Sequence, residues 1–132
     1  SVLNGTVGEM HAKKISALYD LAMKTGAPVI GLVDCAGMRL QEATDALEAF
    51  GGIYLKQTMA SGMIPQITAV FGTCGGGMAV VPALTDFTFI ESKKGKMFVN
   101  SPNALDGNYT EKCDTASAEF QSRETGLIDA VE

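Results

Sequence analysis

The sequence lacks the features that mark several large classes of protein. Its three cysteines, Cys35, Cys74 and Cys113, are an odd number without close spacing, which argues against a disulfide framework and against a zinc knuckle. No stretch approaches the roughly 20 apolar residues of a membrane span, and the N-terminus has no basic region followed by an apolar run. We therefore expect no structural metal and a reducing, cytoplasmic setting.

Basic residues are too few and too scattered for a nucleic-acid-binding surface. Ten Lys and Arg residues stand against 15 Asp and Glu residues, which gives a net charge of −5. The only basic cluster is Lys93, Lys94 and Lys96. A solvated turn between strands is the preferred interpretation of this cluster, and contact with the phosphates of a coenzyme is the alternative.

The chain is long enough for one compact core and too short for two ordinary domains. It has 132 residues, of which 46% are hydrophobic. We therefore predict one domain over residues 1–132. The chain starts at Ser1 rather than at Met, so we expect it to be a piece of a longer protein.

Hydrophobic periodicity alternates between helix and strand, which predicts an α/β fold. Two apolar strands separated by a long helix are typical of a right-handed βαβ crossover, so we expect parallel strands, with the first buried on both faces. Helices are expected over residues 9–25, 41–63 with a kink at Gly51 and Gly52, 78–84 and 115–124, and strands over 29–33, 65–71, 87–90, 96–99 and 127–131. Residues 100–113, rich in Asn, Asp, Gly and Pro, are predicted to form a loop.

Two loops with small residues follow the first two predicted strands, residues 34–39 (DCAGMR) and 72–77 (GTCGGG). Ligands bind at the carboxyl ends of parallel strands, where helix N-termini and unpaired amides point outward. Converging amides from two loops would form an oxyanion hole, in which each donor is worth about 3–4 kcal/mol. The alternative is that Gly75 to Gly77 only allow tight strand-to-helix packing. Neither a P-loop nor a G-x-G-x-x-G motif is present.

Few side chains are available for proton transfer or nucleophilic attack. Cys35 or Cys74 paired with His11 is conceivable, although small buried cysteines beside strand ends more often serve packing. Arg39 and Glu42 are spaced as an i, i+3 ion pair, and a functional role is equally open. Gln41 is either an N-terminal capping contact or a ligand donor.

Five segments, in order, resemble the carboxyltransferase domains of biotin-dependent acyl-CoA carboxylases and decarboxylases, in the crotonase/ClpP superfamily. They are residues 5–11 (GTVGEMH), 27–32 (APVIGL), 34–42 (DCAGMRLQE), 74–77 with 82–87 (CGGG, PALTDF), and 120–121 with 125–131 (FQ, TGLIDAV). The resemblance implies a crotonase-like β-β-α spiral. The family's opening strands have no counterpart before Ser1, so we expect a partial domain.

The resemblance also implies a reaction and its participants. Carboxylate would pass between carboxybiotin and the α-carbon of an acyl-CoA while backbone amides hold the thioester enolate. A biotin carrier protein and a second carboxyltransferase domain or subunit would be partners, in a homo- or hetero-oligomer. The amides implied are those of Gly37, Met38, Gly76 and Gly77, and the implied substrate contacts are Ala36, Arg39, Gln41, Cys74 and Gly75.

The sequence differs from the usual family pattern at three positions, and two other activities of the superfamily are alternatives to carboxyl transfer. Cys35, Ala36 and Met38 stand where the family usually has Ser, Gly and Ala, and Met38 is expected to narrow the pocket or to change the acyl group accepted. A ClpP-like protease would need a nucleophile where Gly77 stands, and an enoyl-CoA hydratase would need carboxylates within residues 78–84, which contain none. A non-catalytic assembly subunit of the same fold remains the main alternative.

Overall fold

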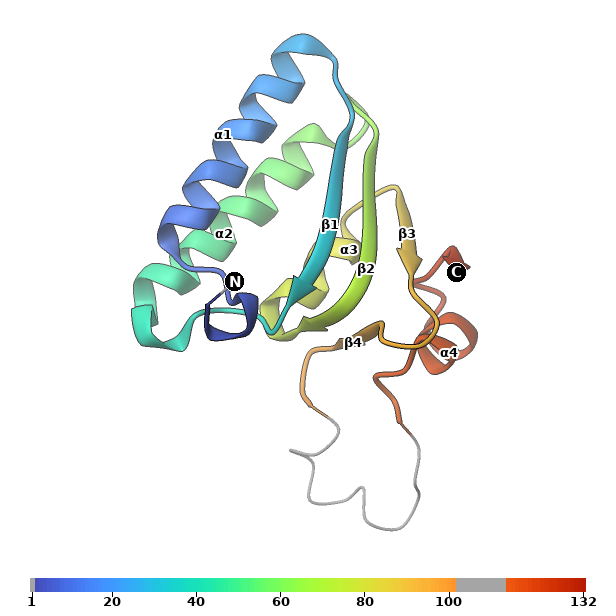
Figure 1. Cartoon of the computed structure of the whole chain (residues 1–132). Helices are drawn as coiled ribbons and strands as arrows, with labels where there is room; N and C mark the ends of the chain where they lie inside the picture. The colour runs from blue at the N-terminus through green and yellow to red at the C-terminus, as the bar shows by residue number, and fades with distance from the viewer. Residues whose placement is uncertain (1, 102–113) are drawn as a thin grey trace.

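The structure, a computed structural model, describes residues 2–101 and 114–132 (Figure 1). Most of the predicted loop 100–113, including Cys113, lies outside the described residues. The helices are α1 (Glu9–Thr25), α2 (Ala43–Ala60), α3 (Val80–Ala83) and α4 (Ala118–Phe120), with short 3-10 turns η1 (Leu3–Gly5), η2 (Leu40–Glu42) and η3 (Gly76–Ala79) and a π-helical turn η5 (Gln121–Thr125). The strands are β1 (Val29–Cys35), β2 (Gln66–Gly75), β3 (Phe87–Ile90), β4 (Lys96–Phe98) and β5 (Ala130–Val131).

The strands form one sheet in the order β1-β2-β3-β5, and β4 pairs with the carboxyl end of β2. Every pairing of these named strands is parallel, which confirms the prediction from the βαβ pattern. Val29 of β1 lies opposite Gln66 of β2, and the register shifts by a bulge between Val33 and Cys35. The carboxyl ends of β1 and β2 are therefore neighbours, which brings together the two segments that follow these strands.

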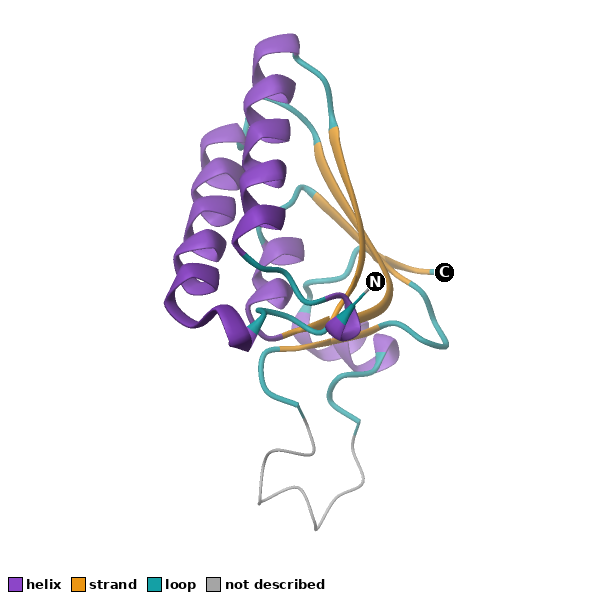
Figure 2. Ribbon diagram, turned by 60° about the vertical axis from the view of Figure 1, so that its left-hand side comes forward, coloured by secondary structure: helices purple, strands orange, loops and turns teal. Residues whose placement is uncertain are grey.

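The helices α1 and α2 cover one face of this sheet (Figure 2). Val33, Val70 and Ile90 point into the core on that side, together with Phe50 and Ile53 of α2. On the opposite face Ile30 and Leu32 of β1 are 61% and 71% exposed. The prediction that this strand is buried on both faces was wrong for the described residues, because they place no layer against its second face.

The helix predictions hold where the signal is local. α1 covers the predicted residues, and Gly26 ends it in the left-handed conformation, with a φ of 71°. The second helix is shorter than predicted, because the 3-10 turn η2 precedes it and it ends at Ala60, and it continues through Gly51 and Gly52 without interruption. The last helical segment begins at Ala118 rather than at Thr115, and its single α-helical turn, α4, passes directly into the π-helical turn η5, which Gly126 ends as predicted. None of the helices described is long and apolar enough to cross a membrane.

The sequence predicted a loop over residues 72–77, but only part of this segment is a loop in the structure. β2 continues to Gly75, because Cys74 still pairs with Cys35 of β1 and Gly75 pairs with Phe98 of β4. Only Gly76 and Gly77 leave the strand, and they begin the 3-10 turn η3, so the following helix starts later and is shorter than predicted. Of the four glycines in this segment, Gly72 and Gly75 therefore belong to β2, and Gly76 and Gly77 belong to the turn that follows it.

Candidate functional site

The two glycine segments come into direct contact at the carboxyl ends of β1 and β2. A Cβ atom added to Gly37 would stand only 2.7 Å from the carbonyl oxygen of Gly75, and one added to Gly76 would stand 4.0 Å from the Cα of Gly37. Gly37 has a φ of 121° and Gly76 a φ of 57°, backbone conformations that favour glycine. The structure thus brings together the two segments that the sequence singled out, and glycine is required for both the approach and the conformation.

The peptide group that joins Gly37 to Met38 has a defined orientation. The Val7 amide donates to the Gly37 carbonyl oxygen at 2.9 Å, and the Arg39 amide donates to the Val7 carbonyl oxygen at 2.9 Å. In a planar trans peptide the N–H points opposite to the C=O, so the Met38 N–H points away from Val7. The Gly37 N–H instead donates to the Sγ of Cys35 at 3.3 Å. Met38 is therefore the better candidate donor of the first loop.

The second segment is held by a residue from α2. The hydroxyl of Tyr54 donates to the Gly77 carbonyl oxygen at 2.6 Å, and its ring packs edge to face on Phe50. A side chain at Gly77 would meet this hydroxyl, at 3.0 Å from an added Cβ. Gly76 and Gly77 open η3, and the first N–H groups of a helical turn lack partners within it.

The side chains of the two cysteines that the structure describes, Cys35 and Cys74, face the core. Cys35 and Cys74 are buried, and Cys74 Sγ donates to the Met78 carbonyl oxygen at 3.4 Å. Burial raises the pKa of the Cys35 thiol, and burial raises the pKa of the Cys74 thiol to about 12. His11 is exposed, and its Nδ1 accepts a hydrogen bond from the Gly8 amide. The structure gives these residues separate partners, so the packing interpretation of the cysteines is preferred to a Cys-His pair.

The residues expected to contact substrate fall into two groups. Ala36 and Gln41 are exposed to solvent, whereas Cys74 and Gly75, at the end of β2, are buried. Arg39 is the exception, because its guanidinium donates to the Thr6 carbonyl oxygen at 3.0 Å and to Glu42 Oε1 at 3.1 Å. Its side chain is only 17% exposed, so the pair is not the solvated ion pair that the spacing alone suggested.

Several contacts that shape the site were not predicted from the sequence. Tyr54 is 23 positions from its partner Gly77, and Val7 is 30 from Gly37, so no local pattern connects them. The Oδ1 of Asp34 accepts a hydrogen bond from the Thr73 amide at 3.0 Å and occupies the space that a side chain at Gly72 would fill. Asp34 thereby supports the bulge where β1 leaves its register with β2.

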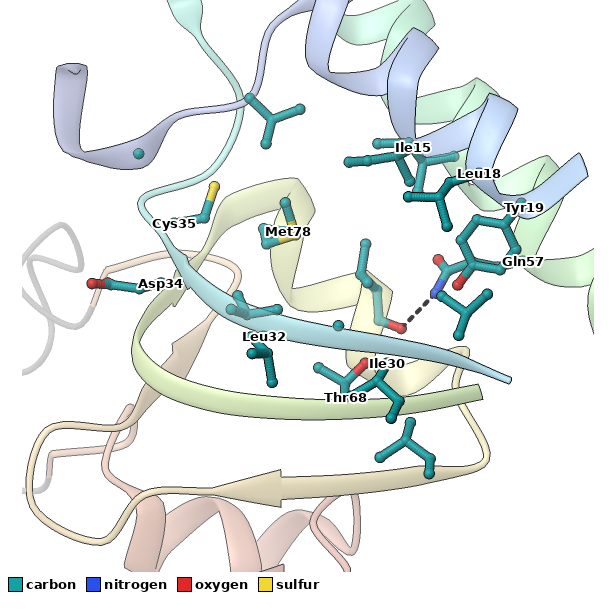
Figure 3. Close-up of a pocket in the computed structure, with 18 of the residues that line it drawn as sticks. Ile15, Leu18, Tyr19, Ile30, Leu32, Asp34, Cys35, Gln57, Thr68 and Met78 are labelled. Carbon is teal, nitrogen blue, oxygen red and sulfur yellow. Dashed lines mark hydrogen bonds between the residues drawn. The ribbon is translucent and has the colours of Figure 1, made fainter. Parts of the chain in front are cut away.

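A pocket of about 420 Å³ lies along the free edge of β1 rather than at the two glycine segments (Figure 3). Ile15 and Leu18 of α1 line it, together with Ile30 and Leu32 of β1. It reaches Cys35 at one end, but none of Gly37, Met38, Gly76 and Gly77 lines it. The converging glycines and this apolar pocket are therefore separate features of the molecule.

Comparisons with known proteins agree on one family. Residues 1–125 match the family model described as the carboxyl transferase domain. The methylmalonyl-CoA decarboxylase subunit alpha of Propionigenium modestum is 48% identical over 105 residues, which cover 80% of this chain and 20% of that protein. The propionyl-CoA carboxylase beta chain of Roseobacter denitrificans is 39% identical over 133 residues, which cover 98% of this chain and 26% of that protein.

Solved structures extend the likeness to the fold. A crystal structure of transcarboxylase 12S, a hexamer described with hydrolysed methylmalonyl-coenzyme A bound, has a TM-score of 0.88 and 31% identity. The match covers 96% of this chain and 25% of that chain. The chain thus spans about a quarter or less of the length of these relatives.

Proposed function

Because the chain belongs to the family of carboxyl transferase domains, we propose that it takes part in carboxyl transfer between carboxybiotin and the α-carbon of an acyl-CoA. The relatives named above act on acyl-CoA thioesters, which supports this substrate class. Biotin, carried by a partner protein, would hold the carboxyl group at the other end of the transfer, in whichever direction the group moves. A second carboxyltransferase domain or subunit would complete the site, because this chain spans only part of its relatives.

The observation that carries the proposal is the contact between Gly37 and the Gly75–Gly76 segment within the region that matches the family. Carboxyl transfer to or from the α-carbon passes through an enolate with negative charge on the thioester oxygen, and donors fixed in advance stabilise that charge without reorganising. We assign this role to the amides of Met38 and Gly77, with Gly37 and Gly76 providing the backbone conformation. Gly77 lies beyond the pairing of β2 with β4, which ends at Gly75 and Phe98.

The proposal needs little acid or base chemistry from side chains. Both described cysteines are buried with raised pKa values, so neither is a ready nucleophile at neutral pH. Amides fixed by hydrogen bonds, as the Gly37–Met38 peptide is by Val7, are suited to holding an oxyanion. In this proposal the chain stabilises charge, while the substrate and the carboxyl donor supply the reacting atoms.

The test is carboxyl transfer by the protein assembled with its biotin carrier, measured as movement of a labelled carboxyl group to or from an acyl-CoA. Gly77→Pro removes one amide donor, and Gly77→Ala is the matched control that adds a Cβ but keeps the N–H. We expect Gly77→Pro to lower kcat by about 10²–10³-fold relative to Gly77→Ala. Equal rates in the two variants would contradict the assignment of this amide.

The assay also separates the alternative of a non-catalytic assembly subunit. Met38, which motivated that alternative, is only partly exposed and packs against the main core. Its side chain is thus at least partly withdrawn from any ligand, while its amide is preserved. Acyl-CoA binding without any transfer by the wild-type assembly would favour the non-catalytic alternative, and absence of binding would refute the substrate class.

A further inference from the structure

The residues around the first loop form a clamp whose parts come from two segments of the chain, residues 6–9 and 39–42. The clamp is defined here as Thr6, Val7, Glu9, Arg39 and Glu42. Val7 lies beside the loop and exchanges hydrogen bonds with Gly37 and Arg39 at 2.9 Å each. The backbone on both sides of Val7 is held by charged side chains, Arg39 on one side and Glu42 on the other.

Before Val7, the guanidinium of Arg39 holds the backbone. It donates to the Thr6 carbonyl oxygen at 3.0 Å and to Glu42 Oε1 at 3.1 Å. A charged donor makes a stronger hydrogen bond than a neutral one, and the planar guanidinium serves both acceptors at once. Arg39 is half-buried, with a side chain 17% exposed, so water competes weakly for these contacts.

After Val7, the carboxylate of Glu42 holds the backbone. Its Oε2 accepts from the Glu9 amide at 2.6 Å, at the start of α1. The Glu9 amide, and then Arg39, hold the pKa of Glu42 below its usual range. Gly8 is required for this arrangement, because a Cβ there would overlap the Glu42 carboxylate. The carboxylate therefore remains charged, and joined to both Arg39 and α1, at neutral pH.

We infer that Arg39 and Glu42 are positioning residues for the oxyanion-binding amide of Met38, acting through Val7 rather than by touching substrate. This inference rests on the function proposed above. Val7 donates to the Gly37 carbonyl, so its position sets the direction of the Met38 N–H in the same peptide group. Removing the clamp frees Val7 to shift, and a displacement of about 1 Å at a catalytic group costs about 10²-fold in rate.

The experiment uses the protein assembled with its biotin carrier and two independent readouts. The first is the kcat and KM for acyl-CoA, and the second is hydrogen exchange at the amides of residues 37–39. Arg39→Ala removes the clamp, whereas Glu42→Gln keeps an oxygen acceptor in place. Arg123→Ala is the control, because Arg123 forms a comparable but exposed i, i+4 pair with Glu119, with side chains 73% and 72% exposed.

We expect Arg39→Ala to lower kcat by about 10–100-fold, to change KM by less than about twofold, and to speed exchange at residues 37–39. Glu42→Gln should lower kcat less than Arg39→Ala, and Arg123→Ala should change neither readout. If Arg39→Ala does not fold, Gly8→Ala displaces the Glu42 carboxylate while keeping both charged side chains and should reproduce the effect on kcat and exchange.

Three results would overturn the inference. A raised KM with unchanged kcat would make Arg39 a substrate ligand. A lower kcat with unchanged exchange would mean that Arg39 does not act through the loop. Faster exchange with unchanged kcat would mean that the clamp does not support the reaction. A wild-type assembly that transfers no carboxyl group would refute the proposed function itself, and the exchange measurement would still report whether Arg39 and Glu42 hold the loop.

Discussion

Adding one methyl group at Gly37 is the most direct perturbation of the contact between the two glycine segments. The new Cβ would stand 2.7 Å from the Gly75 carbonyl oxygen, whereas ordinary contact begins near 3.4 Å. The two segments must therefore separate by about 0.7 Å, the difference between these two distances. The φ of 121° is also unfavourable for alanine, at a cost of about 1–3 kcal/mol. Gly37→Ala should thus lower both stability and activity.

Two matched variants separate the effect of the contact from the effect of the backbone conformation. Gly76 has a φ of 57° and no closer neighbour than 4.0 Å, so Gly76→Ala carries the conformational cost inside the site without the collision. Gly26 has a φ of 71° with nothing within 4 Å, so Gly26→Ala carries that cost at the end of α1, outside the two glycine segments. Each of these should lower the free energy of unfolding by about 1–2 kcal/mol.

The assays are the kcat for carboxyl transfer in the assembled protein and the free energy of unfolding from denaturant titration. Since 1 Å of misplacement costs about 10²-fold, a separation of this size should lower kcat by roughly 10–100-fold in Gly37→Ala. Gly26→Ala should leave kcat unchanged, and Gly76→Ala should lower it less than Gly37→Ala. A Gly37→Ala variant with the kcat of the wild type would refute the reasoning that the spacing of the two segments sets the rate.

Three further outcomes are expected. Tyr54→Phe removes the 2.6 Å hydrogen bond to the Gly77 carbonyl and should lower the free energy of unfolding by about 1 kcal/mol, with a fall in kcat as the readout that a purely structural role would not give. Met38→Ala removes a half-buried side chain that packs on the core and should cost about 1–2 kcal/mol, measured by denaturant titration, while kcat stays unchanged because the amide is kept. In a Cys113→Ser background, alkylation of Cys74 should be roughly 10³-fold slower in the folded than in the unfolded protein, because its pKa is raised to about 12. Since an exposed thiol ionises near about pH 8.5, the stability from the buried neutral thiol is full below that pH and is lost as the pH rises toward 12. Rapid labelling of Cys74 at pH 8 without loss of structure would contradict its burial.

The parts of the fold that follow from local pattern were predictable. α1 was predicted over its full length, because its apolar positions recur at helical spacing and Gly26 supplies the left-handed end. The parallel pairing of β1 and β2 followed from the helix between them. The end of β2 was not predictable, because Gly72 and Gly75 are poor strand formers and this segment stays extended beside Asp34, β1 and β4.

In the candidate site, too, features with a local sequence pattern were predictable and features that depend on distant contacts were not. The glycines were identifiable from the sequence, because a backbone position with positive φ, or one that closely approaches another backbone segment, favours glycine over other residues. The residues that orient those glycines were not, because any amide could do what Val7 does and tyrosine is common in helices for packing alone. Arg39 was identified, but its spacing from Glu42 left a solvated pair and a functional role equally open and gave no indication of the contact with Thr6.

The contacts of Val7 with the first loop, and the packing of Met38 on the core, change the expected effect of the Met38 side chain on function. At the level of sequence, a large side chain in place of a small one was the main reason to expect a narrowed or altered pocket. In the structure the oxyanion-directed group would be a backbone N–H whose direction depends on Val7, and the Met38 side chain packs against the core. Replacement of that side chain leaves the peptide group and its two neighbours in place. Arg39 and Gly37 affect the position of the peptide group itself, so their substitution should reduce carboxyl transfer more than substitution of the Met38 side chain.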